Sequence, residues 1–215
     1  MLDHIPPVTK AYLTIATIVM VLCTLDILSP FNLYLNWLLI TREYQFWRLI
    51  TCFFFFGNFG LHFFWNAYVL IFYCSSLEEV VFHSRSADFL WMLLTCSCML
   101  LLLSYFFGAG YFFSGAIINV MTYIWGRRNP STRMSVFFFT VKAPYLPWVL
   151  MGTALLIGWR PWDNLMGIIV GHTYYFFEDI FPFMPISKGF KLLKTPKILC
   201  KLFKQRTDEY NRQIY

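Results

Sequence analysis

The sequence contains little charge: only 13% of its 215 residues are charged, whereas 59% are hydrophobic and 21% are aromatic. A soluble domain carries about a quarter charged residues, so a mean hydropathy of +0.58 argues against a water-soluble globule. The same shortage of charge excludes a disordered chain, a collagen and a coiled coil. The length allows one compact membrane domain with little room for anything else.

The sequence also lacks paired cysteines. None of its six cysteines forms a CxxC pair, and all but Cys200 lie in apolar runs, where cysteine behaves as a small hydrophobic residue. We therefore expect free core thiols, and no motif predicts a cofactor, a metal or a nucleic-acid partner. No small-residue cleavage site follows the first apolar run, which predicts that this run is retained as a membrane anchor.

Long uncharged runs dominate the chain. The runs 49–77 and 89–126 contain no charged residue, and the second is long enough for two helices that meet at Gly108-Ala109-Gly110. The gaps between charges predict an all-α polytopic membrane protein with six helices, near residues 11–28, 57–77, 88–107, 112–127, 143–159 and 163–181. Residues 1–185 would form this membrane domain, and residues 186–215 would form a basic cytosolic tail.

Basic residues are distributed unevenly between the two sides of this arrangement. All of them except Arg42, Arg48 and Arg160 fall on the side that holds both termini. The positive-inside rule therefore predicts that both termini are cytosolic. The last uncharged run, 164–177, rises only about 21 Å. This is less than the hydrocarbon thickness of about 30 Å, which predicts local thinning of the bilayer.

Two segments outside the spans have an amphipathic composition. The first connection, from Ser29 to Arg48, mixes aromatic and polar residues, which favours a position in the membrane interface, although an ordinary aromatic belt also fits. In the tail, one helical face carries apolar residues and another carries lysines: Ile198, Leu199, Leu202 and Phe203 against Lys197, Lys201 and Lys204. A helix on anionic lipid and a solvated basic tail are both compatible with this pattern.

Polar residues inside apolar runs are functional hypotheses by default. They comprise the pair Trp47-Arg48, His62 and Asn66 one turn apart, Ser114 after the glycine-rich turn, and Asn164 and His172 around the close-packing pair Gly167 and Gly171. Plainer alternatives exist for several of them. An arginine at a membrane edge commonly snorkels, and a histidine and an asparagine can simply hydrogen-bond across helices.

The order of these features resembles the rhomboid fold. In rhomboid proteases, the serine of a Gly-x-Ser-Gly loop is the nucleophile, and a histidine three residues before Gly-x-x-x-Gly is its base. A histidine and an asparagine of the second helix help to form the oxyanion hole. On this chain the nucleophile position falls on Ser114, the oxyanion positions on His62 and Asn66, and the base position on Asn164.

Position 164 departs from the protease pattern. A serine hydroxyl is a weak nucleophile without an adjacent base, and asparagine has no basic nitrogen. His172 lies about two turns further along the helix, far from Ser114. Phe112 also stands where the protease loop has a glycine. The sequence therefore predicts a proteolytically inactive rhomboid-like protein.

Along almost its whole length the chain resembles the derlins, a family of rhomboid-like pseudoproteases. The matching stretches are IPPV (5–8), FWRLIT (46–51), WGRRNP (125–130), APYLPWVL (143–150), GIIVGH (167–172) and LKTP (193–196). The resemblance implies a six-helix rhomboid-like fold in the endoplasmic reticulum membrane. It also implies a bilayer thinned around a lateral opening between the second and fifth helices.

The implied function is endoplasmic-reticulum-associated degradation, in which misfolded proteins pass to the cytosol for ubiquitination. Implied partners are misfolded clients, a membrane ubiquitin ligase complex, a cytosolic AAA ATPase and the lipid bilayer, and the resemblance leaves a homo- or hetero-oligomer open. Many animal derlins end in a Gly-rich box that binds the ATPase. The tail printed here has no glycine after Gly189, which points to recruitment by another subunit.

Two alternatives belong to other functional classes. An active intramembrane serine protease is kept open by Ser114, His62 and Asn66. A small transporter would commonly show an internal repeat with paired broken helices, and the sequence shows no such repeat.

Overall fold

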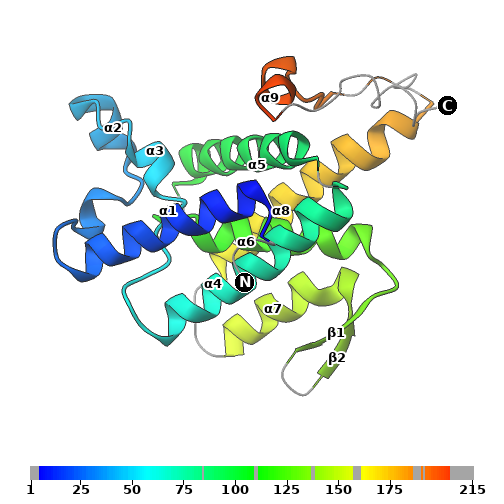
Figure 1. Ribbon diagram of the computed structural model, residues 1–215, viewed down its shortest axis with the longest axis horizontal. Helices are drawn as coiled ribbons and strands as arrows, with labels where there is room; N and C mark the ends of the chain where they lie inside the picture. Colours follow the sequence, from blue (N-terminus) through cyan, green and yellow to red (C-terminus); the bar gives the residue numbers. More distant parts are fainter. Residues whose placement is uncertain are drawn as a thin grey trace.

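The computed structural model describes residues 5–83, 85–108, 111–136, 139–156, 161–185, 190 and 192–203. These residues form a bundle of α-helices with one small β-hairpin (Figure 1). The helices are α1 (Pro7–Thr24), α2 (Trp37–Glu43), α3 (Arg48–Thr51), α4 (Leu61–Ser75), α5 (Ser86–Phe107), α6 (Ser114–Arg128), α7 (Leu146–Leu156), α8 (Trp162–Tyr175) and α9 (Lys197–Leu202). The prediction of a predominantly helical chain is confirmed.

Helices α1, α4, α5, α6, α7 and α8 lie at the six expected positions, with shifted ends. Helix α1 starts earlier than predicted because Pro7 suits the first helical turn. It ends earlier because the chain turns at Asp26, which has a φ of 55°. Helix α4 starts later than residue 57 because Gly57 has a φ of 100° and Gly60 is extended.

Two of these helices continue as π-helical segments. Helix α4 runs on as η3 (Ser76–Val81), and α8 runs on as η5 (Phe176–Ile180) before the short turn η6 (Phe181–Phe183). The last helix is therefore longer than the uncharged run 164–177 from which a short span was predicted. Together α8 and η5 fit the predicted range 163–181, and Glu178 and Asp179 lie in the final turns, so the uncharged part of this helix is still the run 164–177 and the thinning of the bilayer stays a prediction.

Among the described residues, helices α1 and α5 are long and apolar enough to cross a membrane. Large apolar side chains are exposed on the outside of the bundle, among them Ile18 of α1, Phe64 of α4 and Leu102 of α5. Such a surface suits lipid rather than water. The count of six spans stays a prediction.

The expectation of an all-α chain is wrong between α6 and α7. Strands β1 (Arg133–Val136) and β2 (Phe139–Lys142) pair antiparallel, with Arg133 opposite Lys142 and Met134 opposite Val141. Valine, threonine and phenylalanine, which favour strands, are concentrated in this connection. The short helix η4 (Ala143–Tyr145) follows, so α7 begins later than residue 143.

Helix α6 is the centre of the bundle, and its residues from Ser114 to Gly126 are buried almost without interruption. It packs most extensively on α8 and also contacts α4, α5 and α7. The first connection folds as η2 (Pro30–Asn32), α2 and α3. Figure 1 shows α2 and α3 at one end of the bundle, away from β1 and β2.

All six cysteines are free thiols. Four are buried, namely Cys23, Cys52, Cys74 and Cys96, whereas Cys98 is exposed on α5 and Cys200 is half-buried on α9. The expectation of core thiols is therefore wrong for Cys98, which lies in an apolar run but on the outer face of its helix.

Candidate functional site

Ser114 is the first residue of α6 and is buried, with 6% of its surface exposed. Its hydroxyl donates a hydrogen bond of 2.6 Å to the carbonyl oxygen of Phe55, which lies between α3 and α4. A carbonyl oxygen accepts a hydrogen bond but does not take the proton at neutral pH. The hydroxyl therefore connects α6 to the α3–α4 segment and is not activated by this contact.

The loop before Ser114 is filled by aromatic side chains. The ring of Phe112 lies 4.7 Å from the ring of Phe55, centroid to centroid. The backbone amide of Phe113 donates to the carbonyl of Cys52 at 2.9 Å. Phe112 thus packs this loop against the segment that also accepts the hydrogen bond from Ser114.

His62 and Asn66 contact each other on α4. The amide nitrogen Nδ2 of Asn66 lies 3.1 Å from Nδ1 of His62, and this same ring nitrogen lies 3.3 Å from the carbonyl of Phe56. Gly57 makes the approach possible, because its φ of 100° turns the chain immediately after Phe56. His62 is exposed and Asn66 is half-buried, so the pair presents polar groups on the outside of α4.

Asn164 occupies the first turn of α8 and is half-buried. Its neighbour Asp163 lies beside the start of α6, with Oδ2 3.3 Å from the position of a Cβ built on Gly115. Sequence reasoning used Asp163 only as the boundary of an uncharged run and did not find this approach. Among the described residues, no hydrogen bond joins the Asp163 carboxylate to the Ser114 hydroxyl.

Helices α6 and α8 meet at Gly167 and Gly171, and we call this contact the α6–α8 seam. A Cβ on Gly167 would lie 2.5 Å from the Cβ of Asn119 and 2.8 Å from the carbonyl oxygen of Ala116. A Cβ on Gly171 would lie 2.9 Å from the Cβ of Tyr123. Real Cβ atoms do not approach this closely, so the seam requires glycine at both positions.

Beyond the seam, His172 contacts α6 through Tyr123. The Tyr123 hydroxyl lies 2.7 Å from Nδ1 of His172 and accepts a hydrogen bond of 3.0 Å from Nε of Arg127. Tyr123 is nine residues after Ser114, about 13 Å along a regular helix. His172 is therefore placed to hold the two helices together and is remote from the serine.

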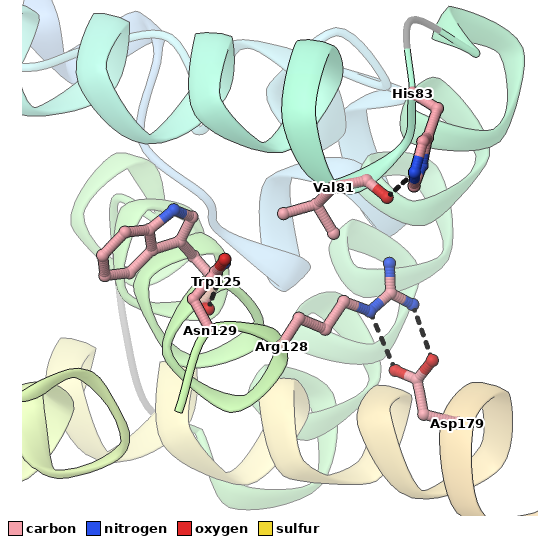
Figure 2. A network of polar contacts seen from close by, with 6 residues as sticks. All are labelled: Val81, His83, Trp125, Arg128, Asn129 and Asp179. Carbon is pink, nitrogen blue, oxygen red and sulfur yellow. Dashed lines mark hydrogen bonds and ion pairs between the residues drawn. The ribbon is translucent and has the colours of Figure 1, made fainter. Parts of the chain in front are cut away.

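The far end of α6 is joined to the extension of α8 by an ion pair, shown in Figure 2. Arg128 contacts Asp179 with two nitrogens, Nε to Oδ2 at 3.0 Å and Nη2 to Oδ1 at 3.1 Å. The guanidinium also lies 4.7 Å from the centre of the Phe82 ring. Asn129 closes the helix by donating from Nδ2 to the carbonyl of Trp125.

Trp47 and Arg48 have different surroundings although they are adjacent. Arg48 is buried, and its Nη1 donates to the carbonyls of Phe31 and Tyr34 at 2.8 Å and 3.0 Å. Its Nε donates to Oε1 of Gln45 at 2.7 Å. Arg48 thus holds the first connection in place, whereas Trp47 is exposed, in keeping with an aromatic belt.

Glu78, in η3, is a buried carboxylate that sequence reasoning missed. It accepts hydrogen bonds from the backbone amides of Val8 and Thr9, from the Thr9 hydroxyl and from the Ser86 hydroxyl, at 2.6–3.1 Å. The carboxylate caps the amino end of α1 and ties it to the start of α5. The sequence offered only one signal, the Glu78-Glu79 pair at the end of an uncharged run. It did not indicate the partners, because Val8 and Thr9 are distant in sequence.

Comparison with known proteins identifies extensive similarity. A model of the Der1-like family matches residues 5–197. Derlin-2.2 of Arabidopsis thaliana is 41% identical over 211 residues, which cover 93% of this chain and 85% of that protein. Derlin-2.2 of Zea mays is 40% identical, covering 93% of this chain and 84% of that protein. Derlin-1 of Oryza sativa subsp. japonica is 36% identical over 202 residues, covering 93% and 82%.

Proposed function

The chain belongs to the Der1-like family, and we propose that it is a non-catalytic derlin of endoplasmic-reticulum-associated degradation. In this role it binds misfolded proteins and aids their passage from the endoplasmic reticulum to the cytosol. Family membership along nearly the whole chain supports the general role. The contacts around Ser114 support the absence of proteolysis.

The observation that carries the non-catalytic part is the hydrogen bond from Ser114 to Phe55. A serine nucleophile needs a base that takes its proton, and loss of a triad base lowers the rate by several orders of magnitude. The proton of Ser114 points to a carbonyl, and the base position holds Asn164, whose amide does not accept a proton at neutral pH. We infer that Ser114, His62, Asn66 and Asn164 are vestigial protease positions.

The packed contacts support a role in which shape matters more than chemistry. The α6–α8 seam holds the central helix closely against α8, and the Arg48 contacts hold the first connection together. Outside this frame, His62 and Asn66 give α4 two hydrogen-bonding groups on a largely apolar surface. Such groups suit a client segment that carries polar atoms into the membrane, where unpaired polar groups are costly.

The proposed setting is the endoplasmic reticulum membrane, with several spans and with both termini in the cytosol. The basic residues support this orientation through the positive-inside rule. The proposed partners are a membrane ubiquitin ligase complex and a cytosolic AAA ATPase. Glycosylation acceptors inserted at Asn36 and after Tyr215 test the orientation: modification only at Asn36 is expected, and modification at the tail would overturn it.

The function is tested by combining isolation from native membranes with a degradation assay. Ligase and ATPase subunits should copurify with the full-length protein, and removal of the protein should lengthen the half-life of a misfolded membrane reporter. Restoring the wild-type chain should shorten that half-life again. Unchanged decay after removal, together with no ligase subunit in the purified complex, would contradict the proposal.

The runner-up is an active intramembrane serine protease. The observation in its favour is the Asp163 carboxylate beside Gly115, one residue from the Ser114 hydroxyl. A rotation of Ser114 away from Phe55 would be needed before any carboxylate could receive its proton. Labelling of the wild-type protein by a fluorophosphonate, lost in Ser114→Ala, would promote this alternative.

A further inference from the structure

The tail segment 192–203 is docked on α5 through specific contacts. Nε1 of Trp91 donates to the carbonyl of Leu193 at 3.0 Å, and the Thr195 hydroxyl donates to Oδ1 of Asp88 at 2.5 Å. Leu193 and Phe203 pack against the hydrophobic core. The docking therefore fixes the position of α9 relative to α5, as Figure 1 shows with α9 lying alongside that helix.

The contacts on α5 lie close to one end of a helix that is long enough to cross a membrane. Asp88 and Trp91 are in the first two turns after Ser86, about 3 Å and 8 Å from the helix start. Asp88 is also paired with Arg85, whose Nε lies 3.3 Å from its Oδ2. Charged groups at this depth mark the boundary between the acyl chains and the headgroups. Helix α9 is thus held at the level of the headgroups.

The face of α9 that points away from α5 combines apolar and basic side chains. Ile198 and Leu202 are one turn apart, and 79% and 72% of their surfaces are exposed. Lys197 and Lys201 are likewise one turn apart and exposed. The apolar pair favours acyl chains and the lysine pair favours anionic groups, which is the composition of an interfacial helix.

We propose that α9 is an interfacial helix that binds anionic phospholipid headgroups of the leaflet on the side of the tail. Ile198 and Leu202 enter the boundary of the acyl chains, and Lys197 and Lys201 pair with phosphate or carboxylate groups of the lipids. The Thr195–Asp88 and Trp91–Leu193 contacts set the depth of the helix. This inference goes beyond the proposed function and does not depend on client degradation.

A nitroxide at position 202 of the full-length protein in lipid nanodiscs tests the proposal. Leu202→Cys is combined with Cys98→Ser and Cys200→Ser, because the other four cysteines are buried. Oxygen concentrates in lipid and a nickel chelate in water, so their collision rates report the depth of the label. In nanodiscs with anionic lipid, the label should be accessible to oxygen and protected from nickel.

Reversing both charges, with Lys197→Glu and Lys201→Glu, should shift the label towards water. The equilibrium between the lipid-inserted and the water-exposed position of the label should shift towards water by about fivefold for each lysine lost at low salt. The matched control reverses two exposed basic residues outside the tail, Lys10→Glu and Arg133→Glu, and should leave the label in lipid. High nickel access in both anionic and zwitterionic nanodiscs would overturn the proposal in favour of a solvated tail, and equally low access in both would overturn the binding of anionic headgroups by the lysines. Dipolar broadening would show that the labels of two copies of the chain lie close together. If this broadening persisted after charge reversal, it would overturn the proposal in favour of a second copy covering this face of α9.

Discussion

The same two helices form both the Ser114 region and the α6–α8 seam, yet the two regions are built differently. At the start of α6, Ser114 is hydrogen-bonded to a carbonyl, and Asn164 of α8 offers no base. Further along, Gly167 and Gly171 bring the backbones so close that a single methyl group does not fit. The two helices therefore meet in a demanding packing contact at Gly167 and Gly171, whereas near Ser114 the described residues join them by no comparable contact.

The largest expected effect comes from filling the seam. Gly167→Leu should destabilise the folded protein by about 3 kcal/mol and slow client degradation, because the added side chain meets Asn119 and the Ala116 carbonyl, which cannot move aside. The control is Gly152→Leu in α7, since a Cβ there meets nothing within 4 Å. Thermal unfolding in detergent compares the two. Equal stability of both variants would contradict a tightly packed seam.

Glu78→Gln should have the next largest effect. The buried carboxylate of Glu78 accepts only hydrogen bonds, whereas the NH₂ of glutamine donates them and would leave a buried donor without its acceptor. Losing that acceptor should lower the free energy of unfolding by about 2–3 kcal/mol. Glu79→Gln is the matched control, because Glu79 is exposed and adjacent. Hydrogen exchange of α1 measures the result, with faster exchange at its first turn expected only for Glu78→Gln. If the two variants exchange equally, Glu78 does not anchor α1.

Arg48→Ala should cost about 2 kcal/mol, because the carbonyls of Phe31 and Tyr34 lose a charged donor. The first connection should become susceptible to protease, and client degradation should slow while the protein still reaches the membrane. The control is Arg42→Ala, at an exposed position of α2. Normal proteolytic protection and normal degradation in Arg48→Ala would remove Trp47-Arg48 from the functional positions.

The Arg128–Asp179 pair should contribute less, because both side chains are partly exposed. Arg128→Ala should cost about 1 kcal/mol, and Arg85→Ala, which breaks an exposed ion pair with Asp88 and a long hydrogen bond to the Phe82 carbonyl, should cost about 0.5 kcal/mol or less. Chemical denaturation measures the difference. An effect of Arg128→Ala as large as that of Gly167→Leu would show that the end of α6, and not the seam, dominates stability.

Much of this architecture follows from local sequence patterns. Gaps between charges predicted helices where α1, α4, α5, α6, α7 and α8 lie, and the spacing of Gly167 and Gly171 indicated a close helix contact. The family prediction is confirmed by the comparisons, because long motifs in order are specific. The β-hairpin was missed because charge gaps place connections without showing how those connections fold.

The partners of the key residues could not be predicted, because they are remote in sequence. Glu78 meets Thr9, and Gly171 meets Tyr123, through folding alone. Asp163 immediately precedes the uncharged run 164–177 and was given no role, so its approach to Gly115 was missed. A pattern identifies a residue type suited to a contact, whereas the contact itself depends on how distant helices pack.

Ser114→Ala is expected to have the smallest effect on client degradation, namely none, and it tests the central claim most directly. The substitution removes one hydrogen bond to Phe55, worth about 1 kcal/mol, and no chemistry. The decisive measurement is the half-life of a misfolded membrane client in cells that carry only Ser114→Ala or only the wild type. Equal half-lives, with no fluorophosphonate labelling of the wild type, are the predicted result. A client stabilised by Ser114→Ala, with labelling that depends on Ser114, would contradict the account.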